Sequence, residues 1–211
     1  MQVKVMKNIL RANDMLAEEI REILKQNNVR MFNVLGSPGA GKTAVLEAIL
    51  PKLQSLGKRV AVIEGDCATS NDADRIAVFN VPVIQINTGS GCHLDANMIR
   101  KAAGEFDLSQ LDIIFIENVG NLVCPASFDL GEEAKIAVIS VTEGDDKPLK
   151  YPRIFNESQL VVLNKIDLVP YTNFQRETFY TALESSKAGA VCYEVSCTKE
   201  EGFEALINYI K

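Results

Sequence analysis

The chain has 211 residues, of which 47% are hydrophobic, and its 22 basic and 28 acidic residues give a net charge of −6 and a pI near 5.0. We expect a single domain over residues 1–211, because this length suffices for one substantial core. An acidic chain without a basic block is not expected to bind nucleic acid or a membrane surface. The first ten residues carry charges where a signal peptide has its apolar segment, and no apolar run approaches the ~18 residues that span a bilayer, so we expect a cytoplasmic protein.

Apolar residues near the amino terminus recur at helical spacing and predict an amphipathic helix over about residues 8–27; they are Ile9, Leu16, Ile20, Ile23 and Leu24. Short apolar, β-rich runs predict strands at 31–35, 60–63, 83–86, 112–116, 136–141, 160–163 and 191–195. Further helices are expected at 42–56, 94–103, 172–185 and 201–210, and the polar stretch 142–153 is expected to be a loop. This alternation predicts an α/β fold, with a mostly parallel central sheet and helices on both faces.

A glycine-rich segment lies between the first predicted strand and the helix after it, with the sequence Gly36-Ser37-Pro38-Gly39-Ala40-Gly41-Lys42-Thr43. This is the spacing of a P-loop, in which consecutive backbone N–H groups point at phosphate oxygens. Lys42 adds positive charge for the β- and γ-phosphates, and the Thr43 hydroxyl can ligate Mg²⁺. We therefore predict that this segment, expected to be an exposed loop, binds a nucleoside triphosphate together with Mg²⁺.

The tetrapeptide at 164–167, Asn-Lys-Ile-Asp, follows a predicted strand at the end where ligands bind in parallel sheets. The Asp167 carboxylate can accept hydrogen bonds from guanine N1–H and the exocyclic amine, whereas adenine has no N1–H. Asn164 can steady the P-loop, and the stem of Lys165 can lie over the base. Such a polar turn is common alone, but after a P-loop it predicts GTP binding, with Ser196 and Cys197 in a second loop near the base.

Two predicted strand ends carry acidic residues that could act with the phosphates. Asp66 could reach Mg²⁺ directly or through water, and Glu117 could position Mg²⁺ or the attacking water. The N–H of Gly120 could sense the γ-phosphate. We therefore assign catalytic roles to Lys42, Asp66 and Glu117, while the alternative interpretation is that both carboxylates are merely solvated strand ends.

The odd number of cysteines disfavours a disulfide framework; they are Cys67, Cys92, Cys124, Cys192 and Cys197. The only histidine, His93, directly follows Cys92, and Cys124 comes four residues after Gly120. Thiolate and imidazole together suit Zn²⁺ or Ni²⁺, so Cys92, His93 and Cys124 form a candidate metal site that leaves one tetrahedral position open. The position of Cys124 suggests that nucleotide and metal are coupled. Buried thiols beside a hydrogen-bonded histidine remain the alternative, and Cys192 is expected to lie in the core.

These motifs together resemble those of the nickel-incorporation GTPases of NiFe-hydrogenase maturation, the HypB family of SIMIBI-type P-loop GTPases. The resemblance covers essentially the whole chain and rests on residues 36–43, 65–66, 91–95, 117–125, 143–152 and 164–167. It implies hydrolysis of GTP to GDP and phosphate by a metallochaperone that assists nickel insertion into the hydrogenase large-subunit precursor, with a HypA-type maturation factor as partner. It further implies a GTP-dependent homodimer with nickel or zinc on Cys92, His93 and Cys124 at the interface. Lys147 and Lys150 would face the nucleotide or the partner subunit.

Three alternatives remain open from the sequence. A urease-type nickel accessory GTPase would have a metal motif that looks like Cys-Pro-His rather than Cys92-His93. A P-loop kinase or ATPase with a structural zinc is disfavoured by the tetrapeptide at 164–167. A regulatory module, in which GTP only controls a protein interface, would bind the nucleotide without an effect of the metal.

Overall fold

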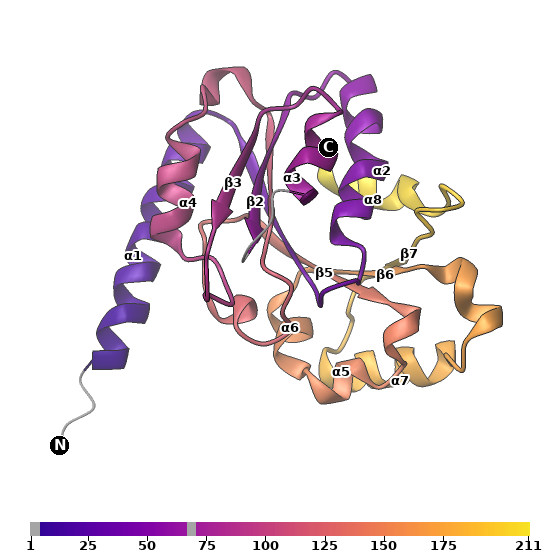
Figure 1. Ribbon diagram of the computed structural model, residues 1–211. Coiled ribbons are helices and arrows are strands. Elements are labelled where there is room, and N and C mark those ends of the chain that lie inside the picture. Colours follow the sequence, from indigo (N-terminus) through magenta and orange to yellow (C-terminus); the bar gives the residue numbers. More distant parts are fainter. Residues whose placement is uncertain (1–4, 67–70) are drawn as a thin grey trace.

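The computed structural model describes residues 5–66 and 71–211, so Cys67 lies outside the described residues. Within these residues, seven parallel strands form one sheet in the order β3-β2-β4-β1-β5-β6-β7 (Figure 1). The strands are β1 (Arg30–Leu35), β2 (Val60–Asp66), β3 (Val83–Asn87), β4 (Ile113–Glu117), β5 (Ala134–Ser140), β6 (Leu160–Asn164) and β7 (Cys192–Glu194). The predicted parallel sheet is thus confirmed.

Helices cover both faces of this sheet. They are α1 (Val5–Gln26), α2 (Lys42–Ser55), α3 (Asn71–Ala77), α4 (Ala96–Ala103), α5 (Lys147–Lys150), α6 (Pro152–Glu157), α7 (Arg176–Ser186) and α8 (Phe203–Ile210). Short 3₁₀ turns lie at Leu108–Gln110, Pro125–Ser127, Val141–Glu143 and Ile166–Tyr171. No described helix combines the length and apolar character needed to cross a bilayer.

The central strand β1 shows how the two faces are filled. Side chains alternate along a strand, so Phe32 and Val34 point to one face, where they join the core formed with α2, α3 and α8. Met31 points to the other face and packs with α1 and α4, and Leu35 packs with α6 and α7. Figure 1 shows α1 and α4 together on one side of the sheet and α2 and α8 on the other. Because β1 is buried on both faces, its sequence is mostly apolar, as expected for a parallel strand.

The predicted loop at 142–153 is wrong. The segment contains the end of a 3₁₀ turn (Val141–Glu143), the short helix α5 and the start of α6 at Pro152. Pro148 and Pro152 lie in the first turn of these helices, where a missing N–H removes no intrahelical hydrogen bond. Both prolines therefore begin helices within the polar stretch that was expected to be a loop.

Two further expectations about helices need correction. Helix α3 was not predicted, since its seven residues are mostly polar and too few to show a hydrophobic period. The predicted amphipathic helix is present as α1, but it begins at Val5, and Ile23 is 43% exposed instead of packing on the core. Ala17, Ile20 and Leu24 form its buried face.

Candidate nucleotide and metal site

The P-loop connects β1 to α2 at the middle of the sheet's carboxyl edge. Gly39 and Gly41 have φ angles of +79° and +95°, in the left-handed region that favours glycine. Any Cβ at Gly41 would also collide with the side chain of Asn164. Asn164 Nδ2 donates a hydrogen bond to the Ala40 carbonyl at 3.0 Å, so the end of β6 supports the loop from below.

Lys42 and Thr43 begin α2 and are only 7% and 5% exposed, so the expectation of an exposed loop is wrong for these two residues. Lys42 Nζ lies 3.5 Å from the carbonyl oxygen of Ser37 and 3.9 Å from Glu117 Oε1. The Thr43 hydroxyl donates to the same Glu117 oxygen at 2.9 Å. The lysine predicted to bind phosphate, the hydroxyl predicted to ligate Mg²⁺ and the predicted catalytic carboxylate therefore form one cluster.

A cavity of about 350 Å³ opens in front of this cluster, lined by the P-loop, the ends of β2 and β4, and residues of α3. Glu64 and Glu117 are opposite each other on the paired strands β2 and β4 and are 2% and 4% exposed. Burial raises the pKa of both carboxyl groups, and the charge of Glu117 raises the pKa of Glu64 further. Glu64 Oε1 and Glu117 Oε2 have no hydrogen-bond partner within the described parts of the chain. Two orphaned carboxylate oxygens beside a phosphate-binding loop fit a Mg²⁺ ion, which prefers oxygen ligands.

Asp66 also lines the cavity, as the sequence led us to expect, but Glu64 and Asp72 line it as well and were missed. The predicted second strand stopped at residue 63, so Glu64 was not considered as part of a buried strand. A charged residue inside an otherwise apolar parallel strand was the signal that could have found it. Asp72 belongs to α3, where it pairs with Arg75 at 3.0 Å.

The residues predicted to bind the base lie together. Asp167 Oδ1 accepts a hydrogen bond from the Ser196 hydroxyl at 2.6 Å, and Cys197 Sγ lies 3.3 Å from Asn164 Oδ1. Lys165 has a left-handed backbone, with φ +62°, and its ammonium donates to the Gly39 carbonyl at 2.7 Å. The ends of β6 and β7 therefore form one polar surface beside the P-loop.

Gly120 and the residues after it attach the segment of Cys124 to the P-loop. A Cβ at Gly120 would lie 2.9 Å from Pro38 Cγ, so this close approach requires glycine. Asn121 N donates to the Gly36 carbonyl at 3.0 Å and forms an isolated antiparallel bridge with that residue. Asn121 Oδ1 then accepts from the N–H of Cys124 at 3.4 Å. These three contacts join the P-loop to the segment that carries Cys124.

Cys92, His93 and Cys124 converge, with their ligand atoms all within 4.8 Å of one another. Cys92 Sγ is 3.6 Å from His93 Nδ1, and the imidazole stacks on Phe128 with the ring centroids 3.9 Å apart. All three ligands are half-buried. Burial lowers the pKa of His93, which favours the neutral imidazole that a metal requires. Two thiols and one imidazole at this spacing fit zinc or nickel.

The lysines expected to face the nucleotide or the partner subunit, Lys147 and Lys150, have contacts within their own segment. Lys150 pairs with Asp146, and Lys147 Nζ lies 5.8 Å from the centre of the Tyr151 ring. Neither is among the described residues that line the cavity. The neighbouring Glu143 does reach the P-loop, where it accepts a hydrogen bond from the Ser37 hydroxyl. Sequence reasoning missed this contact.

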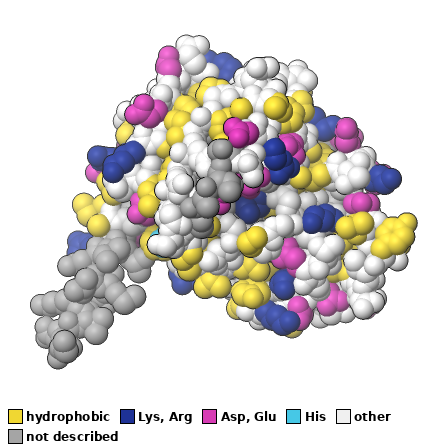
Figure 2. All heavy atoms as spheres, viewed as in Figure 1, with side chains coloured by type: hydrophobic (Ala, Val, Ile, Leu, Met, Phe, Trp, Pro, Cys, Tyr) yellow, Lys and Arg dark blue, Asp and Glu magenta, His cyan; other side chains and the backbone are white. Residues whose placement is uncertain are grey.

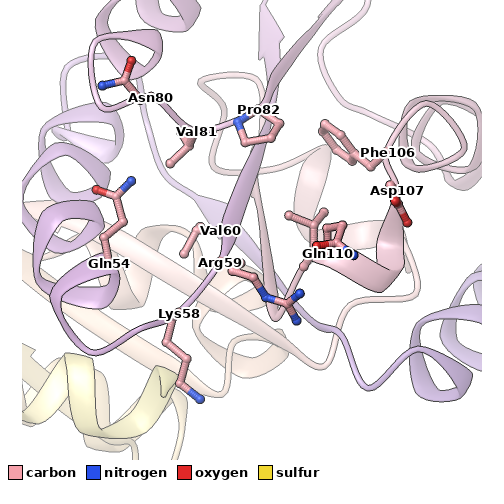
Figure 3. A pocket seen from close by; sticks show the side chains of 11 residues that line it. Gln54, Lys58, Arg59, Val60, Asn80, Val81, Pro82, Phe106, Asp107 and Gln110 are labelled. Atoms are coloured by element: carbon pink, nitrogen blue, oxygen red, sulfur yellow. The ribbon is translucent and has the colours of Figure 1, made fainter.

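Cys192 and a second cavity lie away from the nucleotide and metal residues described above. Cys192 lies on the last strand, β7, and packs partly buried against the core, where burial raises its pKa to about 12. The second cavity, also about 350 Å³, opens at the amino ends of β2 and β4 (Figure 3). Its Arg59 is already paired with Asp112 at 2.8 Å. Since the two volumes are equal, the chemistry of the lining residues assigns the nucleotide to the P-loop cavity.

Comparison with known proteins agrees with this geometry. The family described as "CobW/HypB/UreG, nucleotide-binding domain" matches residues 30–193. The hydrogenase maturation factor HypB of Escherichia coli K12 is 47% identical over 204 residues, which cover 97% of this chain and 70% of the relative. The chain belongs to the HypB family. HypB of Rhizobium leguminosarum bv. viciae is 49% identical over 209 residues, with 99% of this chain and 70% of that HypB covered.

Solved HypB structures share the same fold. The structure of HypB from Helicobacter pylori in complex with nickel superposes with a TM-score of 0.87 at 37% identity, covering 94% of this chain and 93% of that HypB. HypB from Archaeoglobus fulgidus gives a TM-score of 0.88 at 35% identity, with 95% and 97% covered. A LAO/AO transport system kinase, at 20% identity and a TM-score of 0.60, shares the fold alone. The SIMIBI-type P-loop fold is therefore confirmed.

Proposed function

We propose that this member of the HypB family is a GTP-hydrolysing metallochaperone that assists nickel insertion into the large-subunit precursor of a NiFe-hydrogenase. The observation that carries the proposal is the convergence of the ligand atoms of Cys92, His93 and Cys124 within 4.8 Å, with the segment of Cys124 joined to a P-loop. Relatives at 47–49% identity are hydrogenase maturation factors, and one solved relative is a nickel complex. Nickel is the cargo, and the nucleotide is the switch.

Guanine recognition would rest on Asp167. Its Oδ1 is fixed by the Ser196 hydroxyl, which leaves Oδ2 available for the donors of the base. The Lys165 side chain crosses to the Gly39 carbonyl, so its aliphatic stem is placed to cover one face of the base. These contacts support GTP over ATP.

Hydrolysis would use the cluster at the start of α2. Lys42 supplies positive charge at the phosphates, and Glu117 holds the Thr43 hydroxyl in place at 2.9 Å. Thr43, Asp66 and Glu117 would hold Mg²⁺, with Glu64 beside them; bound there, the ion supplies charge that offsets the charge developing on the phosphate oxygens. The Gly120 N–H, held against the P-loop, would donate to the γ-phosphate.

The metal site would respond to the nucleotide. Three ligands from one chain leave a coordination position for water or for a ligand from a second subunit, so a twofold dimer could complete the site. When the γ-phosphate leaves, Gly120 loses its partner, and the bridge between Asn121 and Gly36 carries the change to Cys124. We propose that GTP favours the dimer and that GDP loosens it.

Partners and location follow from the same proposal. The factor that supplies nickel would be a HypA-type protein, and the acceptor would be the hydrogenase precursor in the cytoplasm. Lys147 and Lys150, which lie on α5 near Asp146 and Tyr151, are candidates to contact the second subunit. Figure 2 shows basic and acidic side chains interspersed on one face, as suits contacts with proteins rather than with a polyanion.

The test is the nickel and zinc content of purified protein after dialysis with GDP or with a non-hydrolysable GTP analogue and Mg²⁺. We expect one metal ion per site, with different retention in the two nucleotide states. Cys92→Ser should lose the metal in both states, whereas the matched control Cys192→Ser, on the last strand, should retain it. Equal retention by wild type in both states, or loss caused by the control, would contradict the proposal.

A further inference from the structure

Four buried polar side chains form a hydrogen-bonded network next to the two segments that carry the candidate metal ligands. Asn33, in the middle of the central strand β1, is fully buried. Its Oδ1 accepts from Asn118 Nδ2 at 3.2 Å, and its Nδ2 donates to Glu132 Oε1 at 3.1 Å. Lys135 Nζ lies 3.7 Å from the same Glu132 oxygen. These four residues are between 0% and 9% exposed.

Each end of this network is hydrogen-bonded to one segment of the metal site. Asn118 Oδ1 accepts from the backbone N–H of Leu94, the residue after His93, at 3.2 Å. Leu94 is itself confined, because a Cβ at Gly65 would lie 2.7 Å from its Cδ1. At the other end, Lys135 Nζ donates to the carbonyl of Ala126, two residues after Cys124, at 3.2 Å.

The network also contacts the nucleotide site. Asn118 directly follows Glu117, which accepts a hydrogen bond from the Thr43 hydroxyl. The backbone N–H of Asn118 donates to the carbonyl of Val34 in β1 at 3.0 Å. Asn118 also lines the P-loop cavity. A shift of the β4 end on nucleotide binding therefore moves the group that holds Leu94.

Stability alone does not account for these side chains. Asn33 shares its face of the sheet with Met31 and Leu35 and lies between their two apolar clusters, where a leucine would bury apolar surface. Burying polar groups is costly unless they are hydrogen-bonded, and replacing a buried polar network with apolar side chains is often neutral or stabilising. A network held in such a place fixes the relative position of what it joins.

We propose that Asn118 is a positioning residue that couples the nucleotide site to the Cys92-His93 segment, and that Asn33, Glu132 and Lys135 hold it in register with the Cys124 segment. This inference rests on the proposed function. It adds a second route to the bridge between Asn121 and Gly36, which reaches Cys124 alone. A movement of the end of β4 would then move both the Cys92-His93 segment and the Cys124 segment.

The test measures Ni²⁺ affinity with GDP and with a non-hydrolysable GTP analogue, from the thiolate-to-nickel charge-transfer absorption. Coupling of this kind gives wild type an affinity ratio of about 5–100-fold between the two states. In Asn33→Leu, which touches neither ligand, the ratio should fall to about twofold or less, while GTP hydrolysis without metal is retained. Asn118→Ala should also lose the ratio, and Asn118→Asp, which keeps an oxygen for Leu94, should retain more of it.

The control is Ile136→Val, a core change on the opposite face of the sheet, which should keep the wild-type ratio. Circular dichroism and the melting temperature establish that each variant is folded. A wild-type ratio in folded Asn33→Leu and Asn118→Ala would overturn this inference and leave the proposed function intact. Equal Ni²⁺ affinity of wild type in both states would overturn both.

Discussion

At the scale of single residues, the proposed choice of GTP over ATP rests on one carboxylate, that of Asp167. Asp167 is fixed by a 2.6 Å hydrogen bond from Ser196 and lies in the 3₁₀ turn that follows β6. The last residue of β6, Asn164, supports the P-loop. The same short segment therefore joins base recognition to phosphate binding. Changing the Asp167 carboxylate to an amide should alter base recognition without disturbing phosphate binding.

We expect Asp167→Asn to weaken GTP binding by about 1–3 kcal/mol, because an amide cannot accept both hydrogen bonds from guanine. Xanthosine nucleotides, which present a carbonyl at the exocyclic position, should bind this variant better than GTP does. Competition against a fluorescent GTP analogue measures both effects. Should ATP compete as well as GTP against wild type, the role of Asp167 is wrong.

Glu64 carries a prediction about pH. Burial, and then the charge of Glu117, raises the pKa of Glu64 in the folded protein above its ordinary value of about 4.3. As pH rises above that value, the unfolded chain gives up the proton while the folded protein keeps it, so folding stability falls with pH until the raised pKa is reached.

For nucleotide-free and Mg²⁺-free protein, we therefore expect the free energy of unfolding to decline between about pH 5 and pH 9. Glu64→Gln, which mimics the protonated group, should show a smaller decline. Urea unfolding at several pH values measures the difference. Identical pH profiles for wild type and variant would show that Glu64 is ionised in the folded protein.

What could be predicted at this scale depends on how local the signal is. Lys42 and Asp167 belong to short motifs whose spacing alone indicates their chemistry. In the structure Lys42 lies near the carbonyl of Ser37, and Asp167 accepts a hydrogen bond from Ser196. Asn33 and Asn118 are 85 residues apart and meet only because β1 and β4 pair. Glu64 likewise acquires its partner from the neighbouring strand β4, so its position in an apolar run could indicate burial but not the carboxyl group that it faces.

At the scale of elements, the decisive feature is the segment from β4 to the 3₁₀ turn at Pro125–Ser127. Within it, Gly120 packs on Pro38, Asn121 bridges to Gly36, and Cys124 joins the metal cluster. One loop thus contacts the P-loop at one end and supplies a candidate metal ligand at the other.

We expect Cys124→Ala to lower metal affinity and also to reduce the difference in affinity between the GDP and GTP states, because it removes the ligand on this loop. Cys192→Ala should do neither, since Cys192 lies on β7 and packs against the core. Isothermal titration with Ni²⁺ in both nucleotide states measures the two quantities. Wild-type affinity of the Cys124 variant in both states would remove this residue from the site.

Elements were predicted where hydrophobic periodicity is strong. All seven strands and α2 were found, because apolar runs of this kind occur in buried parallel strands and the helices between them. α3 and α5 were not, because they are short and polar and owe their helical form to tertiary contacts, such as those between α5 and α7.

At the scale of the whole molecule, the parallel sheet gathers every functional segment at one edge. The residues proposed to bind phosphate, Mg²⁺ and the base lie at the carboxyl ends of β1, β2, β4, β6 and β7. The segments with the candidate metal ligands follow β3 and β4. The half-buried thiols lie at this edge, where a second subunit could reach them.

We expect a GTP analogue with Mg²⁺ and Ni²⁺ to shift the protein toward a dimer, because the partner can complete the coordination of the metal. With GDP the monomer should dominate. Sedimentation velocity measures the two species, and Cys92→Ser should weaken the shift. A monomer under all conditions would show that one chain completes the metal site with water.

The coupling that we propose through the hydrogen bond from Asn121 to Gly36 would make the protein respond to the nickel supply of the cell. A contact that lets the bound nucleotide change metal affinity must, by thermodynamic necessity, let the metal change nucleotide affinity by the same factor. A loaded site would therefore prefer one guanine nucleotide and an empty site the other. The protein would then report its own loading through the nucleotide it holds, so that scarcity of nickel would by itself delay the next step of delivery.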